Sequence, residues 1–375
     1  MIHRIYADNA ATTKLDIDAF EAMKPFLLEN YGNASQPYAF ARKPKKALAE
    51  ARATIAACIG ALPEEIYFTS GGTESDNWTI KCFGNRNAVR KVYTSVIEHH
   101  AVLNACKDAT RLSVDSKGIV SPEVLEKALD ADHSTVPNRP STLVSVMLAN
   151  NEIGTIEPIK ELAAVAHAHA ALFHTDAVQA VGHIPIDVHD LGVDMLSASA
   201  HKFNGPKGIG FLYVRKGTPL MPYADGGAQE HGMRAGTENV ASIVGMATAL
   251  QKNCDEMQQT TEKLHTMEHI FIDALRQANV DFMRNGAENH IPGNINISIR
   301  GASGEMLLHR LDLKGISIST GSACDSVNTQ VSHVIQAIGV PQEYAKGTIR
   351  VSFGRENSQE DANLLAQAII GILQK

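Results

Sequence analysis

The sequence predicts an α/β protein, and two observations lead to this expectation. In roughly the first two thirds of the 375 residues, short apolar runs alternate with helix-like patterns, which favours a largely parallel, buried sheet with helices on both faces. From about Val240 the pattern changes to long helical stretches followed by short extended ones. Because a chain of this length suits two domains, we expect a large α/β domain and a smaller α+β domain.

Six apolar runs are expected to form strands of the large domain, at residues 66–69, 91–96, 143–149, 172–175, 195–199 and 209–214. We expect a helix over residues 159–171 and one or two long helices over 241–278. The later part is expected to contain an extended stretch at 294–298, a helix over 304–313 and a packed helix that includes 364–373. We place the large domain at residues 14–254. The small domain combines residues 1–13 with 255–375 and carries a mobile cysteine loop at about 315–330.

The composition argues against several classes of protein. Lys and Arg total 34 and Asp and Glu total 41, and the net charge of −7 argues against nucleic acid as a direct partner. No apolar stretch of the sequence is long enough to span a membrane, and the N-terminal residues lack the pattern of a secretory signal. The five cysteines are an odd number without a CxxC pair, which is typical of a reduced protein, so we expect a cytoplasmic location.

Polar residues follow four of the expected strands, at the edge where open α/β sheets bind ligands. They are Ser70, Gly71, Gly72 and Thr73 after residues 66–69, Asn150 and Asn151 after 143–149, Asp176 and Gln179 after 172–175, and His201 and Lys202 after 195–199. Their side chains would point into one crevice. The glycine turn before a helix suits an anion such as phosphate, although an ordinary helix-capping turn has the same pattern.

Lys202 and Asp176 carry the most specific chemistry of this group. A lysine just past a buried strand can form a Schiff base once desolvation lowers its pKa, and a carboxylate such as Asp176 can pair with a pyridinium nitrogen. A surface lysine and a helix cap are the respective alternatives. His99 follows another strand, where its imidazole could stack on a flat cofactor ring.

Three further features stay open on the residues alone. Cys324 lies in a small, polar segment and could be a nucleophilic thiolate or a bystander thiol. Arg350 could bind a carboxylate through two parallel hydrogen bonds or form a surface ion pair. Among the 16 histidines, His265 and His269 have i, i+4 spacing, but no third ligand is in view and we expect no metal site.

Nine short motifs occur in an order that identifies a family. They are YADNAATT (6–13), YGNAS (31–35), TSGGTES (69–75), EH (98–99), NNEIG (150–154), HTDAVQ (174–179), SAHK (199–202), RAGTEN (234–239) and SAC (322–324). Together they closely resemble the cysteine desulfurases of the NifS/IscS type, which are pyridoxal-phosphate-dependent enzymes of the class V aminotransferase family. The resemblance runs essentially from end to end.

The resemblance implies a homodimer of the PLP-dependent transferase fold type I, with a mainly parallel seven-stranded sheet in the large domain and pyridoxal 5'-phosphate (PLP) as cofactor. Lys202 would hold the cofactor covalently, Asp176 would pair with its ring nitrogen and His99 would stack on the ring. The other implied cofactor-binding residues are Gln179, Gly72, Thr73, Ser199, His201, Asn151 and, from the partner subunit, Thr237. The implied substrate-binding residues are Asn33, Asn151 and Arg350, of which Arg350 would grip the substrate carboxylate.

The implied reaction removes the sulfur of L-cysteine and leaves L-alanine, with Cys324, Lys202 and His99 as the catalytic residues. Lys202 would take the α-proton, and the Cys324 thiolate would take the sulfur as a persulfide. A sulfur-acceptor protein, such as an iron–sulfur scaffold, would then receive it for cluster assembly or thiolation. The alternatives are a related class V enzyme (a selenocysteine lyase or an aminotransferase) and a non-catalytic assembly protein on the same fold.

Overall fold

A seven-stranded sheet organises the large domain of the computed structural model, which describes residues 4–84, 90–131, 141–320 and 331–374. The strand order is β2 (Ile66–Thr69), β8 (Gly210–Val214), β7 (Met195–Ser199), β6 (Leu172–Asp176), β5 (Ser141–Ser145), β3 (Arg90–Ser95) and β4 (Thr110–Leu112). Strand β8 runs antiparallel to both of its neighbours, β2 and β7, and the other neighbouring strands of this sheet pair in parallel. The expectation of a mainly parallel sheet in an α/β fold is therefore confirmed.

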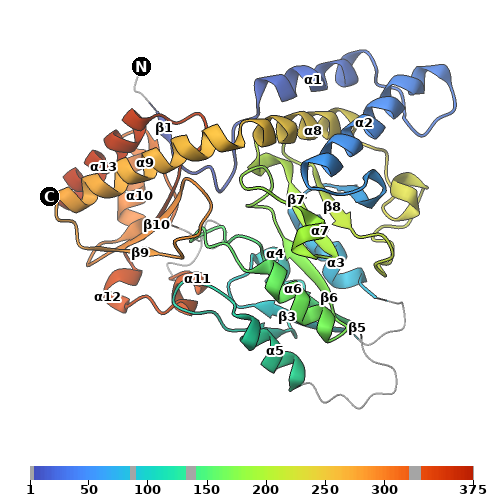
Figure 1. The fold of residues 1–375 in the computed structure, drawn as a ribbon. Helices are drawn as coiled ribbons and strands as arrows, with labels where there is room; N and C mark the ends of the chain where they lie inside the picture. The colour runs from blue at the N-terminus through green and yellow to red at the C-terminus, as the bar shows by residue number, and fades with distance from the viewer. Residues whose placement is uncertain (1–3, 85–89, 132–140, 321–330, 375) are drawn as a thin grey trace.

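The helices of the large domain cover both faces of this sheet (Figure 1). Those between β2 and β8, with the preceding helix, are α2 (Arg42–Cys58), α3 (Gly72–Cys82), α4 (His100–Leu103), α5 (Pro122–Asp130), α6 (Ile159–Ala168) and α7 (Val188–Leu191). Successive residues of β7 point to opposite faces, as the period of a strand requires. Met195 packs with Trp78 of α3 on one face, and Leu196 packs with residues of α2, α6 and α7 on the other.

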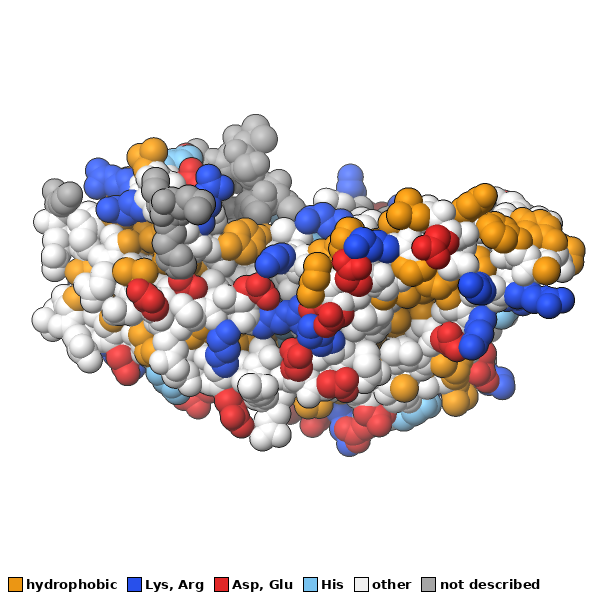
Figure 2. Space-filling view, turned by 90° about the horizontal axis from the view of Figure 1, so that it is seen from above, with side chains coloured by type: hydrophobic (Ala, Val, Ile, Leu, Met, Phe, Trp, Pro, Cys, Tyr) orange, Lys and Arg blue, Asp and Glu red, His pale blue; other side chains and the backbone are white. Residues whose placement is uncertain are grey.

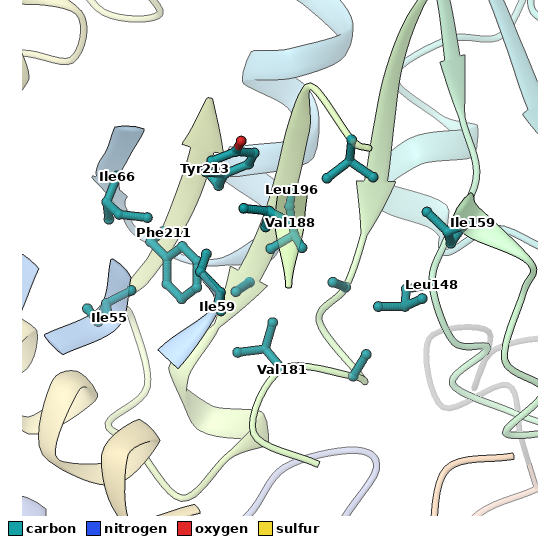
Figure 3. Packing of buried hydrophobic residues seen from close by; sticks show 14 of the residues in the cluster. Ile55, Ile59, Ile66, Leu148, Ile159, Val181, Val188, Leu196, Phe211 and Tyr213 are labelled. Carbon is teal, nitrogen blue, oxygen red and sulfur yellow. The ribbon is translucent and has the colours of Figure 1, made fainter. Parts of the chain in front are cut away.

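Figure 3 shows the second of these two cores, where Ile55, Ile59 and Val188 lie against Leu196 and Phe211. All five side chains are almost completely shielded from solvent. Burying a large aliphatic or aromatic side chain stabilises a fold by about 1.5–3 kcal/mol. The well-packed sheet is therefore rigid, and it holds the residues at its strand ends in fixed positions.

The small domain is built around a three-stranded antiparallel sheet, in the order β12 (Thr348–Ser352), β10 (Asn294–Ile299) and β9 (Phe282–Asn285). A two-stranded sheet pairs β1 (Ile5–Tyr6) in parallel with β11 (Ile316–Ser317). The helices are α9 (Met257–Gln277), α10 (Gly304–Asp312), α11 (His333–Ala337), α12 (Gln342–Ala345) and α13 (Gln359–Leu373). One separate apolar cluster joins Ile5 and Ala7 to α9, α10, α13 and this sheet, which supports the proposed division at 13/14 and 254/255.

Two long helices occupy the region expected to hold one or two. Helix α8 (Val240–Asp255) packs against α1 (Ile17–Leu28) and α2, and α9 continues over the small domain (Figure 1). Glu256 lies between them with a non-helical backbone. In the described residues no helix is both long and apolar enough to cross a membrane.

Several of the expected boundaries differ from those in the structure, and the strands β1, β4, β9 and β11 were missed. β5 ends at Ser145, and residues 146–149 continue toward the strand ends as an extended segment, with Val146 N bonded to His174 O. The helix expected over 159–171 ends at Ala168, because Ala170 takes a left-handed backbone (φ 55°) and Ala171 N bonds back to Ala166 O. The edge strand β4 is too short to give an apolar run, and the strand expected at 91–96 ends at Ser95.

Candidate active site

A cavity of about 290 Å³ lies where the carboxyl ends of β2, β6 and β7 meet residues from the small domain. Ten residues that the sequence pointed to line it: Gly72, Thr73, His99, Asn151, Asp176, Gln179, Ser199, His201, Lys202 and Arg350. Two others, Asn33 and Thr237, do not line it in this chain. Cys324 lies outside the described residues.

The glycine turn after β2 brings the N-terminus of α3 to this cavity. Gly71 has a φ of 150°, which favours glycine, and among the described residues no side chain caps the helix. Gly210 allows the close approach, since a Cβ there would lie 2.7 Å from the Cα of Gly71. A Cβ on Gly72 would lie 2.5 Å from Cγ2 of Val178. Free first-turn N–H groups at a helix N-terminus form a site for an anion such as phosphate.

Lys202 reaches across the cavity to the N-terminal segment. It follows β7 in a single 3₁₀ turn, and its Nζ donates hydrogen bonds to Ala10 O at 2.6 Å and Ala11 O at 2.8 Å. Gln179 Nε2 donates to the same Ala10 oxygen at 3.0 Å. The chain between residues 9 and 13 therefore forms one wall of the site, and it holds the amine at the cavity.

Asp176 is the carboxyl group at the end of β6. It is 4% exposed, and its Oδ1 accepts a hydrogen bond from Val178 N at 2.9 Å. Burial raises the pKa of this carboxyl, whereas His99, the Val178 N–H and Lys202 lower it. A cation placed against Asp176 would favour its charged form, as the ring nitrogen of a pyridinium would.

Two histidines beside the cavity are neutral at pH 7. Nδ1 of His99 accepts a hydrogen bond from Ala101 N at 3.2 Å, so the proton of the neutral ring lies on Nε2. Burial lowers the pKa of His99. Burial, with Lys202 and Lys207 nearby, lowers the pKa of His201 to about 4. A neutral, flat imidazole at His99 is suited to stacking on a cofactor ring.

Arg350 comes to the cavity from β12 of the small domain. Its side chain is 3% exposed; Nη1 donates to Asn151 O at 2.8 Å, and Nη2 to Asp8 Oδ1 at 2.7 Å. Within the described part of the chain, Nε is buried and has no partner. The backbone of Arg350 pairs in both directions with Ser319, which lies directly before the segment that carries Cys324.

Sequence reasoning missed several residues of the cavity wall. The main ones are Asp76, His100, His333, Glu152 and the backbone of Ala10 and Ala11. A signal for Asp76 existed, because it follows Thr73 by three residues on the same helix and so shares its face. No local signal existed for His333, which approaches from α11 with its Nε2 3.1 Å from Glu98 O.

Asn33 and Thr237 lie in one surface region outside this chain's cavity. Oδ1 of Asn33 accepts a hydrogen bond from Ser35 N at 2.9 Å, and the Ser35 hydroxyl bonds to the carboxylate of Glu238 at 3.1 Å. Ser35 and Thr237 are exposed. The two segments that carry the motifs YGNAS and RAGTEN are therefore joined to each other and face solvent.

The histidine cluster near His265 is organised around a carboxylate. Glu268, rather than His269, is the neighbour of His265, at 3.8 Å, and it also contacts His290 at 2.9 Å. Nη2 of Arg284 lies 3.0 Å from Glu268 Oε2 and 2.7 Å from His290 Nε2. Arg284 supplies the positive charge that balances the carboxylate of Glu268. We therefore interpret the cluster as a structural ion-pair network.

Comparison with known proteins identifies the family. Residues 5–365 match the family described as Aminotransferase class-V. The chain is 47% identical to Cysteine desulfurase IscS of Dictyoglomus turgidum, covering 100% of this chain and 96% of the relative. The chain belongs to the cysteine desulfurases of the class-V aminotransferase family. It is also 44% identical to Cysteine desulfurase IscS of Methanosarcina thermophila, covering 99% of this chain and 92% of the relative.

Solved structures agree with this family. One described as a NifS-like protein superposes with a TM-score of 0.89 at 34% identity, covering 99% of this chain and 100% of the other. Another, described as SspA in complex with cysteine, gives a TM-score of 0.77 at 32% identity, covering 93% and 99% of the two chains. The fold expected from the resemblance, that of PLP-dependent enzymes of fold type I, is confirmed.

Members of this family depend on PLP, and the cavity fits this group. The fit rests on the uncapped N-terminus of α3 for the phosphate, the buried carboxyl of Asp176 for the ring nitrogen and the amine of Lys202 for the covalent link. The lack of a side chain at Gly72 leaves room between α3 and Val178. Each of these features has the chemistry that one part of the cofactor requires.

Proposed function

We propose that the chain releases sulfur from L-cysteine as a persulfide on Cys324, leaves L-alanine, and passes the sulfur to an acceptor protein. The observation that carries this proposal is the convergence of Lys202, Asp176 and the N-terminus of α3 on a single cavity. The sulfur would serve iron–sulfur cluster assembly or thiolation. We further propose that the protein acts in the cytoplasm.

Lys202 has two roles in this proposal. When bound, PLP acts as an electron sink that makes the α-proton of an amino acid acidic. Lys202 would hold the cofactor and, after the substrate amine has taken its place, its Nζ would accept the α-proton. Its hydrogen bonds to Ala10 O and Ala11 O support this role, because they define a second position for the amine at the edge of the same cavity.

Arg350 and Asn151 would orient the substrate. The guanidinium group of Arg350 is almost completely buried, and its Nε lacks a partner in the described part of the chain. A carboxylate of the substrate would satisfy that N–H and gain a strong, charge-assisted hydrogen bond. The backbone of Asn151 fixes the guanidinium plane through Nη1. The proposal therefore places the substrate carboxylate on the small-domain side of the cavity.

Cys324 would accept the sulfur. Its thiolate attacks the substrate sulfur, a sulfur–sulfur bond forms and the carbon–sulfur bond breaks. The electron pair of that bond stays with the carbon, which takes up a proton and becomes the methyl group of alanine. The prediction rests on the sequence, since Cys324 lies outside the described residues; the pairing of Ser319 with Arg350 supports it, because it anchors the start of that segment at the cavity.

We propose that two copies form a homodimer through the face that carries α1. Large apolar side chains are exposed there: Ile17, Phe20, Leu27, Leu28, Tyr31, Tyr38 and Phe40. Figure 2 shows hydrophobic side chains gathered over this half of the molecule. An apolar patch of this kind marks an interaction surface. The exposed position of Thr237 supports the idea that it serves the partner's cavity rather than its own.

The test is to incubate the purified protein with PLP and L-cysteine and to measure alanine and the masses of the peptides. We expect the peptide with Cys324 to gain the mass of one sulfur atom. Cys324→Ala should lose alanine production but keep the visible absorption of the cofactor, and Lys202→Ala should lose the covalent link. Cys82→Ala, a half-buried thiol on α3, is the matched control. A colourless wild-type protein that forms no alanine would contradict the proposal, and full activity of Cys324→Ala would favour a related class V enzyme.

A further inference from the structure

Asp76, on the second turn of α3, is a buried residue in the wall of the cavity. Its side chain is 1% exposed and lines the cavity together with Asp176. Within the described residues, Oδ1 of Asp76 has no hydrogen-bond partner. A buried polar atom without a partner costs about 1–3 kcal/mol. Such a place is less costly for a neutral carboxyl group than for a charged one.

The residues around Asp76 supply no positive charge. The basic side chain that contacts Asp76 is His174, whose Nε2 lies 3.7 Å from Asp76 Oδ1. Its ring is fully buried between the hydroxyl groups of Ser145 and Ser197, each at 2.9 Å. Burial lowers the pKa of His174 to about 3, so the ring is neutral at pH 7.

Two further carboxyl groups act on Asp76. Asp176 of β6 and Glu98, which lies just before α4, are both buried in the same region. Burial is the main cause that raises the pKa of Asp76, and Asp176 and Glu98 raise it further; only the hydroxyl of Ser197 lowers it. Asp176 differs from Asp76, because Val178 N, His99 and Lys202 all favour its charged form.

We propose that Asp76 is a positioning residue for the cofactor: its carboxyl group carries the proton of a two-carboxyl pair and leaves the negative charge on Asp176. This inference rests on the proposed role of Asp176 at the ring nitrogen. When two buried carboxyl groups lie in one site, the charge on one raises the pKa of the other, so the less well stabilised group keeps its proton to a higher pH. With the proton on Asp76, Asp176 accepts a hydrogen bond from the ring nitrogen of PLP rather than donating one, and the ring keeps its positive charge.

The experiment compares Asp76→Asn, Asp76→Ala and the control Thr79→Val with the wild-type protein. Asn has the shape of the carboxyl group and is neutral, as a protonated Asp is, whereas Ala removes the group. Thr79 lies on the same helix and is fully buried with an unpartnered hydroxyl within the described residues, but it does not line the cavity. Three quantities are measured without substrate: the Kd of PLP, the pH midpoint of the visible absorption of the bound cofactor, and the Tm of the cofactor-free protein.

Asp76→Asn and Thr79→Val should bind PLP within about twofold of wild type and keep its pH midpoint, because neither changes the charge next to the ring. Asp76→Ala also leaves this charge unchanged, but it removes the polar group that Asn keeps in the site of Asp176; it should therefore weaken PLP binding by about fivefold or more and move the midpoint by about 0.5 pH unit or more. The Tm of cofactor-free Asp76→Ala should stay within about 2 °C of wild type, because the deleted group leaves one oxygen unsatisfied in the folded protein. If Asp76→Ala does not fold, Asp76→Val takes its place with the same expectation.

Three results would overturn the inference. A shift of the midpoint in Asp76→Asn as large as that in Asp76→Ala would mean that the Asp76 carboxyl is charged. Wild-type behaviour of Asp76→Ala would mean that the residue has no influence on the cofactor. A large drop in the Tm of cofactor-free Asp76→Ala would assign Asp76 a purely structural role. By contrast, a wild-type protein that binds no PLP would overturn the proposed function as well.

Discussion

Arg350 donates a hydrogen bond of 2.7 Å to the carboxylate of Asp8, a residue 342 positions earlier in the chain. The contact joins the N-terminal segment to β12 and holds the guanidinium group at the cavity. Because Asp8 binds Nη2 and Asn151 O binds Nη1, the group is held in one orientation before a substrate arrives. Such preorganisation lowers the entropic cost of binding the substrate.

We therefore expect Arg350→Lys to raise the KM for L-cysteine by about tenfold to a hundredfold, since a hydrogen bond to a charged group contributes about 1.5–3 kcal/mol. The ammonium group of lysine cannot form two parallel hydrogen bonds to a carboxylate. Steady-state kinetics of alanine formation measures the effect. Arg300→Lys is the control, because Arg300 is 55% exposed and bonds to Asp281 away from the cavity. An unchanged KM in Arg350→Lys would show that another residue binds the carboxylate.

Gly72→Ala should weaken cofactor binding without unfolding the protein. The added Cβ would lie 2.5 Å from Cγ2 of Val178, so α3 or residues 176–179 must shift. Either shift disturbs the place where the α3 N-terminus and Asp176 meet the cofactor. We expect the Kd of PLP to rise about tenfold or more, as overpacking costs about 1–3 kcal/mol. Equilibrium dialysis measures this, and an unchanged Kd would contradict the proposed phosphate site.

Gly371→Ala should stabilise the protein without affecting cofactor binding, in contrast to Gly72→Ala. Gly371 lies in α13, and in the described structure nothing is within 4 Å of the position of an added Cβ. Its φ is not positive. Alanine should therefore raise the free energy of unfolding by about 0.5–1 kcal/mol through its helix propensity. Urea unfolding measures the change, and PLP binding should stay at the wild-type value.

Glu98→Gln should remove a pH dependence of stability. Burial raises the pKa of Glu98 to about 8, although the Ser95 hydroxyl and Met147 N donate hydrogen bonds to it. Between its unfolded pKa of about 4.3 and about 8, the folded protein holds a proton that the unfolded chain has lost. The free energy of unfolding should thus fall as the pH rises through this window, by at most about 1.4 kcal/mol per pH unit.

The measurement is urea unfolding of wild type and Glu98→Gln at several values between pH 5 and 8, with the same cofactor load in both proteins. Gln is neutral throughout, so its stability relative to wild type should grow as the pH rises. A constant difference across the window would show that Glu98 has the same pKa in the folded and unfolded states.

Leu28→Arg should weaken the proposed homodimer. Leu28 is 74% exposed at the end of α1, next to Leu27 and Tyr31 in the apolar patch. A charge in the middle of an apolar interface costs several kcal/mol when it is left unpaired. Light scattering should show a dimer for wild type and a mass near 40.4 kDa for the variant. Leu313→Arg is the control, because Leu313 is 86% exposed on the small domain; equal masses for all three proteins would rule out this interface.

The sequence predicted the part of the site that depends on local order. Asp176 ends a strand, and Lys202 and Gly72 come three residues after one; parallel strands bring their carboxyl ends to one edge of the sheet. Topology alone therefore collects these residues. The same reasoning predicted most strands of the large domain, since fully buried strands read as continuous apolar runs.

The rest of the site depends on contacts between distant segments, which no local pattern encodes. Arg350 and His333 line the cavity because two domains pack together, and Asp8 holds Arg350 there. The residues alone left open whether Arg350 binds a carboxylate, and the family resemblance favoured that role. The backbone oxygens of Ala10 and Ala11 could not have been predicted, because any residue type offers them. Asp76 was not predicted because it lies on the second turn of α3, whereas the prediction of a phosphate site used only the first turn.

The two backbone hydrogen bonds between Ser319 and Arg350 also limit how sulfur can leave the protein. Cys324 is five residues beyond this fixed point, and an extended chain spans at most about 3.5 Å per residue, so the Cα of Cys324 can lie no more than about 18 Å from that of Ser319. The length of the chain between Ser319 and Cys324 alone rules out sulfur transfer over a greater distance. The acceptor proposed above would therefore have to bind close to β12, with its receiving group inside that sphere.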